Sequence, residues 1–339
     1  MLIGVTGGTG YVGAHCVRAL LRNGVLQDHR IRLLVERGAE GAPVIDELAA
    51  VGDVEVRPGD IRQARTVREF LDGCDAVLHA AGVVGTDSRR DALMWEVNAY
   101  ATESLLTHAV QTGLDPVVLV SSYSALFPAP DGIIGPDTPT AVGRSAYAQT
   151  KGYADRVARR LQSEGAPVVV TYPSSVVGPA FHTAPGVTER GWAPIVRFGA
   201  APRLRGGMQM IDVRDVADVH AALMVPGRGP RRYVCGGELV TFDGMIAALE
   251  RGTGRRFTRI PLHPSVFRGI SRVGDALSGL VPLGDGLSYE AALLLTAATP
   301  TDDSRTLRDF GLTWRSPVEA IVASFSRDRV GEDTSDSSV

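Results

Sequence analysis

A tyrosine and a lysine four residues apart are the side chains in this sequence best suited to proton transfer. Tyr147 and Lys151 belong to the run YAQTK, and positions i and i+4 of a helix share one face. A phenol with a pKa near 10 is a poor acid or base at neutral pH, but a fixed ammonium beside it favours the phenolate. Lowering the phenol pKa by two to three units needs roughly 3–4 kcal/mol, which a partly dry cleft can supply. The pair therefore predicts general acid/base catalysis by Tyr147.

A run of hydroxyl residues precedes this pair. The stretch VLVSSYSALF reads as a strand that ends in serines, and Ser122 stands 25 positions before Tyr147. At the carboxyl end of a strand, Ser122 would face the same crevice and hydrogen-bond a substrate oxygen, orienting it toward the phenol. Ser121 and Ser124 are alternatives for this role, and any of the three could instead satisfy backbone groups at the strand end.

The N-terminal glycines predict a binding site for a pyrophosphate. In TGGTGYVG, Gly8, Gly10 and Gly13 fit G-x-G-x-x-G, and Gly7, Gly10 and Gly13 fit G-x-x-G-x-x-G. The run lies between a strand pattern and a helical pattern, so the free N–H groups at the start of the helix would stabilise a phosphate. Because glycine has no Cβ atom, the phosphate could approach the backbone closely. We expect the cofactor to contact Gly7, Gly10, Tyr11, Val12 and Gly13.

The end of the second strand bears on which dinucleotide binds. Glu36 lies 23 positions after Gly13 and could hydrogen-bond the adenosine ribose. A carboxylate there repels a 2′-phosphate and favours NAD, whereas the adjacent Arg37 could pair with the 2′-phosphate of NADP if it turned inward. We predict NAD, with NADP left open.

Two further strand ends complete the predicted cofactor site. Asp60 in RPGDI could accept a hydrogen bond from the adenine amino group, with Ile61 beside it. The small residues of HAAG would let the cofactor pass close to the sheet edge; they are Ala80, Ala81 and Gly82. Each segment could alternatively be a loop cap or a place of tight packing.

The elements that must position these residues alternate between strand and helix, which is typical of a doubly wound Rossmann sheet in an α/β protein. The predicted strands are Leu2–Val5, Arg32–Val35, Val54–Arg57, Ala76–His79, Val117–Val120 and Val168–Thr171. The predicted helices are Tyr11–Arg22, Val67–Leu71, Met94–Gln111 and Ala146–Ser163.

Beyond residue 175 the alternation weakens and prolines interrupt the chain. We assign 1–173 to the dinucleotide-binding domain, to which 208–236 returns, with Gln209–Pro226 and Arg232–Cys235 rejoining the main sheet. Residues 174–207 and 237–325 form a smaller, discontinuous substrate lobe. The polar stretch 326–339 lacks periodicity and is predicted to be a disordered tail.

The amino-acid composition and net charge limit the classes of partner that we expect the protein to bind. The 339 residues are 44% hydrophobic and 22% charged with a net charge of −3, which gives no electrostatic reason to expect nucleic acid or an anionic membrane and favours a small-molecule substrate. The three cysteines form no Cys-x-x-Cys pair, which fits a reducing cytoplasm. The sequence begins without a basic leader and holds no stretch near 18 uninterrupted apolar residues, so we expect neither a signal peptide nor a membrane span.

Taken together, the motifs resemble the extended short-chain dehydrogenase/reductase family, often described as NAD-dependent epimerases and dehydratases. The resemblance covers about residues 1–325 and rests on TGGTGYVG, GDI, HAAG, VNAYATESLL, VSS, YAQTK, YPSSVVGP and IDVRDVA, in family order. It implies that Tyr147 is the general acid/base, that Lys151 binds the nicotinamide ribose and lowers the Tyr147 pKa, and that Ser122 polarises the substrate carbonyl or hydroxyl.

The resemblance also implies a nicotinamide pocket. YPSSVVGP is similar to the family segment R-P-x-x-V-Y-G-P, so Tyr172, Pro173 and Ser175 are expected near the cofactor, although Tyr replaces the family's Arg and Val177 its Tyr. Asn98 resembles the family's helix asparagine, with helix packing as the alternative.

Departures from the family pattern indicate the reaction class. The Asp and Glu that nucleotide-sugar dehydratases carry after the catalytic strand are replaced by Tyr123 and Ser124, so that elimination is not expected. Met208 occupies the position at which epimerases carry the Arg that binds the diphosphate. One of three other arginines could bind the diphosphate instead, so an epimerase that retains its NAD stays an alternative. The substitutes are Arg203, Arg205 and Arg214.

The remaining similarity is to the dihydroflavonol-reductase and 3β-hydroxysteroid-dehydrogenase branches, in VSSYSALF, IDVRDVADVH and an apolar C-terminal lobe. It implies hydride transfer between nicotinamide C4 and a secondary alcohol or ketone of a small, largely uncharged substrate. A set of apolar residues and segments would line the substrate pocket or form the core of the smaller lobe. The set is Pro264–Val281, Leu287–Ala298, Trp192, Phe181 and Phe198.

Other classes are less well supported. Non-catalytic cofactor-binding regulators of this kind lose the Tyr–Lys pair, which is present here. No G-x-S-x-G elbow occurs, and the seven histidines show no metal-ligand spacing, so neither a serine hydrolase nor a metal site is expected. The family resemblance implies a homodimer through Met94–Gln111 and Ala146–Ser163.

Overall fold

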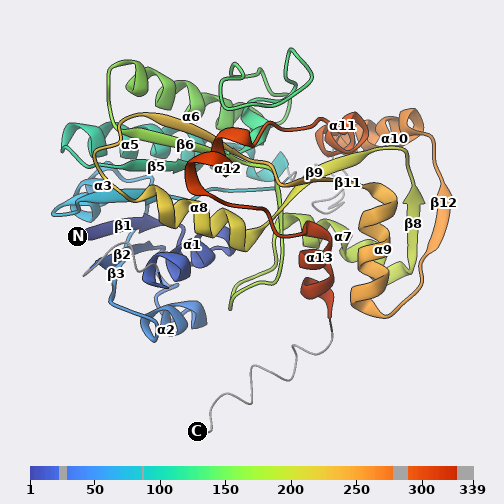
Figure 1. Ribbon diagram of the computed structural model, residues 1–339, viewed down its shortest axis with the longest axis horizontal. Helices are drawn as coiled ribbons and strands as arrows, with labels where there is room; N and C mark the ends of the chain where they lie inside the picture. The colour runs from blue at the N-terminus through green and yellow to red at the C-terminus, as the bar shows by residue number, and fades with distance from the viewer. Residues whose placement is uncertain (23–28, 86–87, 278–288, 327–339) are drawn as a thin grey trace, which may run out of the picture.

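The computed structural model describes residues 1–22, 29–85, 88–277 and 289–326. Its centre is a parallel seven-stranded sheet in the order β10-β6-β5-β4-β1-β2-β3 (Figure 1). The strands are β1 (Leu2–Thr6), β2 (Arg30–Val35), β3 (Val54–Pro58), β4 (Ala76–His79), β5 (Val117–Val120), β6 (Val168–Pro173) and β10 (Arg231–Cys235). The inner strands β1, β4, β5 and β6 are mostly apolar and fully buried because both faces of the sheet are covered, whereas the edge strand β3 (VEVRP) is only partly buried.

Helices pack on both faces. One core joins the sheet to α1 (Tyr11–Arg22), α2 (Pro43–Ala49) and α8 (Val213–Leu223). The other joins it to α3 (Ala64–Leu71), α5 (Thr102–Gln111) and α6 (Ala146–Ser163). Short helical segments precede α5 and follow β5: η1 (Ser88–Arg90), α4 (Asp91–Met94), the π-helix η2 (Trp95–Ala101) and η3 (Tyr123–Ala125).

The strand order reverses between β1 and β4, which pair in parallel from Ile3 with Ala76 to Thr6 with His79. At such a switch point the loops after the two strands leave on opposite faces and open a crevice outside the carboxyl ends. The glycine loop follows β1 and Ala80–Gly82 follow β4, so both predicted cofactor segments meet at this crevice.

The smaller lobe has a separate core. It contains a three-stranded sheet ordered β11-β9-β7 and a two-stranded sheet of β12 and β8. Its strands are β7 (Ser175–Val177), β8 (Ala200–Arg203), β9 (Gly207–Asp212), β11 (Glu238–Thr241) and β12 (Thr258–Pro261). Its helices are α7 (Val187–Phe198), α9 (Phe242–Thr253), α10 (Pro264–Leu277), α11 (Tyr289–Ala297) and α13 (Pro317–Phe325), while α12 (Ser304–Phe310) contacts β10.

The α/β fold and all six predicted strands are confirmed, with small changes at their ends. One prediction is wrong: Gln209–Pro226 does not rejoin the main sheet, because β9 pairs with β7 and β11 and only α8 packs back on α1. The predicted helix Met94–Gln111 is instead split by the π-helix η2. Residues 278–288, which include the ends of two predicted apolar elements, and 327–339 of the predicted tail lie outside the described residues.

Candidate active site

The glycine loop is built so that only glycine fits at its key positions. Gly7 has φ +72°, and a Cβ there would lie 2.5 Å from the backbone N of Ala81. A Cβ on Gly13 would lie 2.0 Å from the Gly7 carbonyl oxygen, which already accepts from Gly10 N at 2.9 Å. Gly10 is exposed, while Tyr11 and Val12 are half-buried. The loop thus presents bare backbone at the start of α1, which suits a pyrophosphate group.

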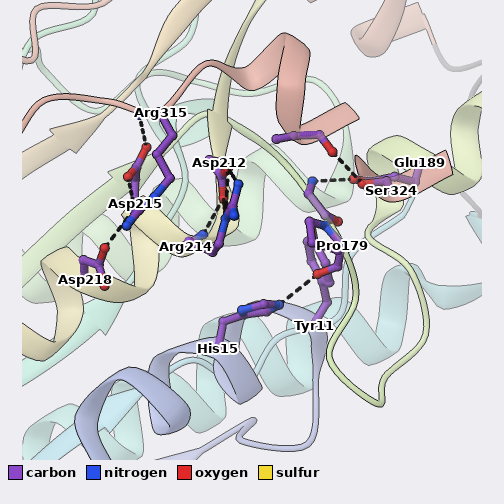
Figure 2. A network of polar contacts seen from close by, with 12 residues as sticks. Tyr11, His15, Pro179, Glu189, Asp212, Arg214, Asp215, Asp218, Arg315 and Ser324 are labelled. Carbon is purple, nitrogen blue, oxygen red and sulfur yellow. Dashed lines mark hydrogen bonds and ion pairs between the residues drawn. The ribbon is translucent and has the colours of Figure 1, made fainter. Parts of the chain in front are cut away.

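Tyr11 and His15 tie this helix start to the smaller lobe (Figure 2). The Tyr11 hydroxyl donates to the Gly178 carbonyl at 2.7 Å, and His15 Nε2 lies 3.0 Å from the Pro179 carbonyl. Burial lowers the pKa of His15 to about 4, so the ring is neutral, which makes Nε2 the donor to that carbonyl. Two side chains one helical turn apart therefore hold two consecutive carbonyls of one loop.

Glu189 of α7 holds the same loop from the other side. Its Oε1 accepts from Gly178 N at 2.9 Å, and its Oε2 has no hydrogen-bond partner in the described part of the chain. Burial raises the pKa of Glu189 to about 7. Burial and the nearby Glu189 carboxylate also raise the pKa of Tyr11, so its hydroxyl stays protonated. Glu189 is absent from the residues predicted from the sequence, because nothing in its local pattern separates it from a solvated helix residue.

Lys151 is buried with its ammonium group beside the end of β5. Its Nζ donates to the Val120 carbonyl at 3.3 Å and lies 5.9 Å from the centroid of the Tyr147 ring. A Cβ added to the exposed Gly82 would lie 3.6 Å from the same Nζ. Burial lowers the pKa of Lys151 to about 8. The lysine therefore joins the predicted catalytic tyrosine to the strand end where the cofactor is expected.

Tyr147 and Ser122 reach the same region from different elements. Tyr147 lies in the first turn of α6, which Ser145 caps by accepting from Ala148 N at 3.1 Å. Ser122 lies two residues beyond the end of β5 and caps η3: its Oγ accepts from Ser124 N and donates to Ser124 Oγ, both at 3.2 Å. Contacts between α6 and η3 bring the two segments together. Ser121, the alternative, is also buried, and its Oγ has no partner among the described residues.

Asn98 braces the site from the middle of the π-helix. Its side-chain amide donates to the Val83 carbonyl at 2.8 Å and its Oδ1 accepts from Val83 N at 2.7 Å, so it holds the loop segment that follows Gly82. Its Nδ2 also lies 3.4 Å from Thr150 Oγ1 on α6. Asn98 therefore links the loop after β4 to α6, the helix that carries the predicted catalytic residues.

His79 fixes the other side of this loop. Its Nδ1 lies 2.7 Å from Thr6 Oγ1 and its Nε2 2.8 Å from Thr102 Oγ1, and Thr6 Oγ1 also accepts from Ala81 N at 3.2 Å. Burial and the Lys151 charge lower the pKa of His79 to about 3, so the ring is neutral. The crevice edge at Ala80–Gly82 is thus held by hydrogen bonds from β1, α5 and η2.

Some predicted contacts need correction. The Tyr172 side chain is fully buried and donates to Asp155 Oδ1 at 2.6 Å, so its hydroxyl points into the core rather than toward the predicted cofactor site. Beside it, Pro173 is buried, and the half-buried Ser175 lies 3.3 Å from the Tyr123 hydroxyl. Both oxygens of Asp60 accept from Arg62, at distances from 2.8 to 3.1 Å, so an adenine amino group would compete with an existing ion pair.

For the other residues predicted from the sequence, the structure shows only where they lie. Glu36 and Arg37 are exposed just beyond β2, at the expected strand end, and Ile61 is half-buried. The three aromatic residues predicted to line one pocket do not share one: Trp192 is in the lobe core, Phe181 packs against Arg18, and Phe198 is exposed. No helix in the described segments is long and apolar enough to cross a bilayer.

Comparison with known proteins decides the family. The model of the NAD dependent epimerase/dehydratase family matches residues 3–236, from β1 through β10. The chain belongs to this family. As a member of the NAD-dependent epimerase/dehydratase family it is an enzyme that uses NAD, as the extended short-chain dehydrogenase/reductase resemblance implied.

Among curated relatives, sterol demethylase protein B of Methylococcus capsulatus is 28% identical over 91% of this chain and 92% of its own length. A putative dihydroflavonol 4-reductase of Synechocystis is 30% identical over 94% of this chain and 92% of its own. Solved family structures have the same fold. That of gox2253 has a TM-score of 0.77 at 24% identity, covering 95% of this chain and 96% of its own. UDP-glucose 4-epimerase from Bifidobacterium longum, solved with NAD⁺ and UDP, has a TM-score of 0.72 at 17% identity, covering 96% of each chain.

Proposed function

We propose that the protein is an NAD-dependent oxidoreductase that transfers a hydride between nicotinamide C4 and a secondary alcohol or ketone of a small, largely uncharged substrate. The observation that carries the proposal is the placement of Lys151, buried between the Val120 carbonyl, the Tyr147 ring and Gly82. A structural lysine gains nothing from such burial, since desolvation of its charge is costly. A lysine that stabilises a phenolate and a ribose needs this position.

In the oxidation direction, Tyr147 takes the proton of the substrate hydroxyl as the carbinol C–H bond breaks. Ser122 hydrogen-bonds the same oxygen and holds it toward Tyr147. Lys151 stabilises the phenolate form that accepts the proton. Bound at the glycine loop, NAD supplies the hydride acceptor at C4. Reduction is the reverse, with Tyr147 returning the proton to the carbonyl oxygen.

The substrate class is supported by what surrounds the site and by the relatives. Met208 is half-buried against the lobe core, so the position predicted to carry a diphosphate-binding arginine in epimerases carries a thioether. The relatives matched over most of the chain include a sterol demethylase protein, a putative dihydroflavonol reductase and a farnesyl-dihydroquinoline-oxide ketoreductase. All three names describe apolar ring systems or their reduction.

Cofactor binding and turnover test the proposal. NAD and NADP are titrated separately by calorimetry, and apolar ketones are then offered with NADH while its absorbance is followed. Tyr147→Phe should lower kcat by about 10²–10⁴-fold with little change in NAD affinity. Tyr100→Phe, which alters an exposed tyrosine of η2, is the matched control and should keep full activity.

An epimerase gives a different result. Protein purified with NAD already bound, which interconverts UDP-sugars without net change in NADH, would replace the oxidoreductase proposal with the nucleotide-sugar epimerase considered from the sequence. Full activity in Tyr147→Phe would contradict both.

We also propose a homodimer through η2, α5 and α6. Trp95, Tyr100 and Tyr153 form mutual ring contacts at 5.9–6.1 Å between centroids on this face, and Tyr100 is 56% exposed. An aromatic cluster open to water is typical of an interface. Tyr100→Arg should halve the mass measured by light scattering, and an unchanged mass would rule out this face.

A further inference from the structure

Two sequence segments of the smaller lobe are rich in arginine. Residues 190–210 and 251–272 contain ten arginines and no aspartate or glutamate, in a chain whose net charge is −3. These two segments make α7's end, β8, β12 and most of α10. The acidic residues that balance the whole chain therefore lie elsewhere in the sequence.

Most of these arginines have no acidic partner within the described ranges. Arg251 pairs with Glu319, and Arg259 pairs with Asp243 and Glu250. Arg190 donates to the Pro185 carbonyl at 2.7 Å. The seven others form no ion pair with any residue that the structure describes, and all are exposed except the half-buried Arg268. The seven are Arg197, Arg203, Arg205, Arg255, Arg256, Arg268 and Arg272, and together they are called the arginine surface.

Hydrogen bonds make this surface continuous. Thr258 N donates to the Gly199 carbonyl at 2.9 Å, and Arg255 Nη1 donates to the Val196 carbonyl at 2.6 Å, which join the end of α7 to the start of β12. The β8–β12 ladder continues to Pro261 opposite Arg203, and α10 begins three residues later. These elements lie together at the end of the molecule farthest from the N-terminus (Figure 1).

Large apolar side chains are exposed among the arginines. The exposed fractions are 73% for Phe198, 54% for Ile260, 51% for Val266 and 48% for Ile270. Val266 and Ile270 are one turn apart on α10, whose neighbouring Phe267 and Ser271 are buried. The exposed apolar residues on α10 are therefore not its core-facing stripe but a second one.

The arginine surface also adjoins the catalytic helix. The guanidinium of Arg272 lies 6.0 Å from the centroid of the Tyr289 ring at the start of α11, and that of Arg144 lies 5.9 Å from the same centroid. Arg144 precedes Tyr147 by three positions. A molecule held at α10 is thus close to the segment that leads into the active site.

We propose that the arginine surface, with Phe198, Ile260, Val266 and Ile270, docks this enzyme onto an anionic lipid bilayer. Arginines attract acidic headgroups, and aliphatic and aromatic side chains between them insert at the interface. A nucleic-acid partner fits less well, because aliphatic side chains gain nothing against a phosphate backbone and base stacking needs several exposed aromatics, whereas this surface has Phe198 alone. The docked face belongs to the lobe that approaches the active site, so an apolar substrate could enter from the membrane. This inference does not depend on the proposed reaction.

Vesicle flotation tests the docking. The full-length protein is mixed with vesicles of phosphatidylcholine alone or with phosphatidylglycerol, at low and high salt. We expect flotation with the anionic vesicles, weakened by salt. Each arginine near such a surface changes binding by about fivefold, so Arg197→Gln/Arg256→Gln should weaken it by about 25-fold. Val266→Ser/Ile270→Ser should also weaken it without a change in charge.

Matched controls separate the outcomes. Arg68→Gln/Arg228→Gln removes the same charge from exposed positions on α3 and after α8, and should bind vesicles within twofold of wild type. Unchanged calorimetric affinity for NAD shows that each variant is folded. The proposal is overturned by absence of flotation, by equal losses in both arginine pairs, or by binding to duplex DNA that exceeds vesicle binding. A smaller mass of Arg197→Gln/Arg256→Gln in light scattering would overturn it too, since a second copy would then cover the surface. Because flotation needs no turnover, failure of the proposed reaction leaves its result intact.

Discussion

Replacing Glu189 with glutamine should change how the stability of the protein depends on pH. Glu189 is 5% exposed, and its Oε1 accepts a hydrogen bond from Gly178 N at 2.9 Å. Burial raises its pKa from the usual 4.5 to about 7. The folded protein therefore binds this proton more tightly than the unfolded chain does.

The sign and size of the expected change in stability follow from the difference between the folded and unfolded pKa of Glu189. A carboxyl whose folded pKa lies above its unfolded pKa contributes stability that is complete below pH 4.5 and is lost as pH rises through 7. A pKa difference of about 2.5 corresponds to roughly 3 kcal/mol of unfolding free energy. Glutamine keeps an oxygen for Gly178 N but cannot ionise, so Glu189→Gln should lack this loss. The variant should gain roughly 3 kcal/mol on wild type between pH 4.5 and 8.

Urea unfolding at several pH values measures the gain. Buried neutral histidines work in the opposite direction, because burial lowers the pKa of His15 and His220 to about 4, and their contribution to stability rises with pH toward 6.5. They are present in both proteins, so the difference between the curves isolates Glu189. Glu238→Gln, at an exposed position on β11, is the control and should follow wild type within about 0.5 kcal/mol. Parallel curves for wild type and Glu189→Gln would refute the reasoning.

Three further predictions concern the cofactor site. Lys151→Met should abolish turnover yet raise the unfolding free energy at pH 7. Burial lowers the pKa of Lys151 to about 8, so its buried charge destabilises the wild type at pH 7, and the wild type regains this stability only above pH 8. Urea unfolding at pH 7 and 10 should therefore show a stability gain for the variant at pH 7 that shrinks at pH 10. Gly13→Ala should abolish calorimetric NAD binding because its Cβ would meet the Gly7 carbonyl at 2.0 Å, whereas Gly41→Ala, with nothing within 4 Å, should bind as wild type does. Glu36→Ala should raise the affinity for NADP relative to NAD, and an unchanged ratio would remove Glu36 from the ribose site.

The Rossmann half could be predicted because its signals are local. The inner strands of the sheet are short apolar runs, and a crossover helix such as α6 repeats apolar residues at three- and four-residue spacing. Parallel topology then follows from the right-handed crossover rule. The smaller lobe could not be predicted in the same way. The strand β9 has the composition of a main-sheet strand, and only its pairing with β7 and β11, which are distant in sequence, assigns it to the other sheet.

The residues of the candidate site also divide into those that local spacing predicts and those that it does not. Tyr147, Lys151 and the glycines are separated by spacings that a helix or a turn converts directly into proximity. The family segment predicted Tyr172 near the cofactor but carried no information on what lies behind it, and Asp155 and Arg159 of α6 hold its hydroxyl inside the core. A motif predicts where the backbone goes, but burial decides where its side chains point.

Tyr11 makes this point most clearly. In the glycine pattern it occupies a variable position, and the motif predicts only its backbone contact with the cofactor. Its side chain nevertheless bonds Gly178, which Glu189 holds from the smaller lobe, and His15 repeats the contact at Pro179. The helix predicted to present its backbone to the pyrophosphate is therefore attached to the lobe predicted to bind the substrate. A shift of that lobe must either carry the start of α1 with it or break buried hydrogen bonds, each worth about 1 kcal/mol or more when its partner is left unsatisfied. The predicted cofactor and substrate sites are thus joined by hydrogen bonds from Tyr11, His15 and Glu189, which no spacing rule marks.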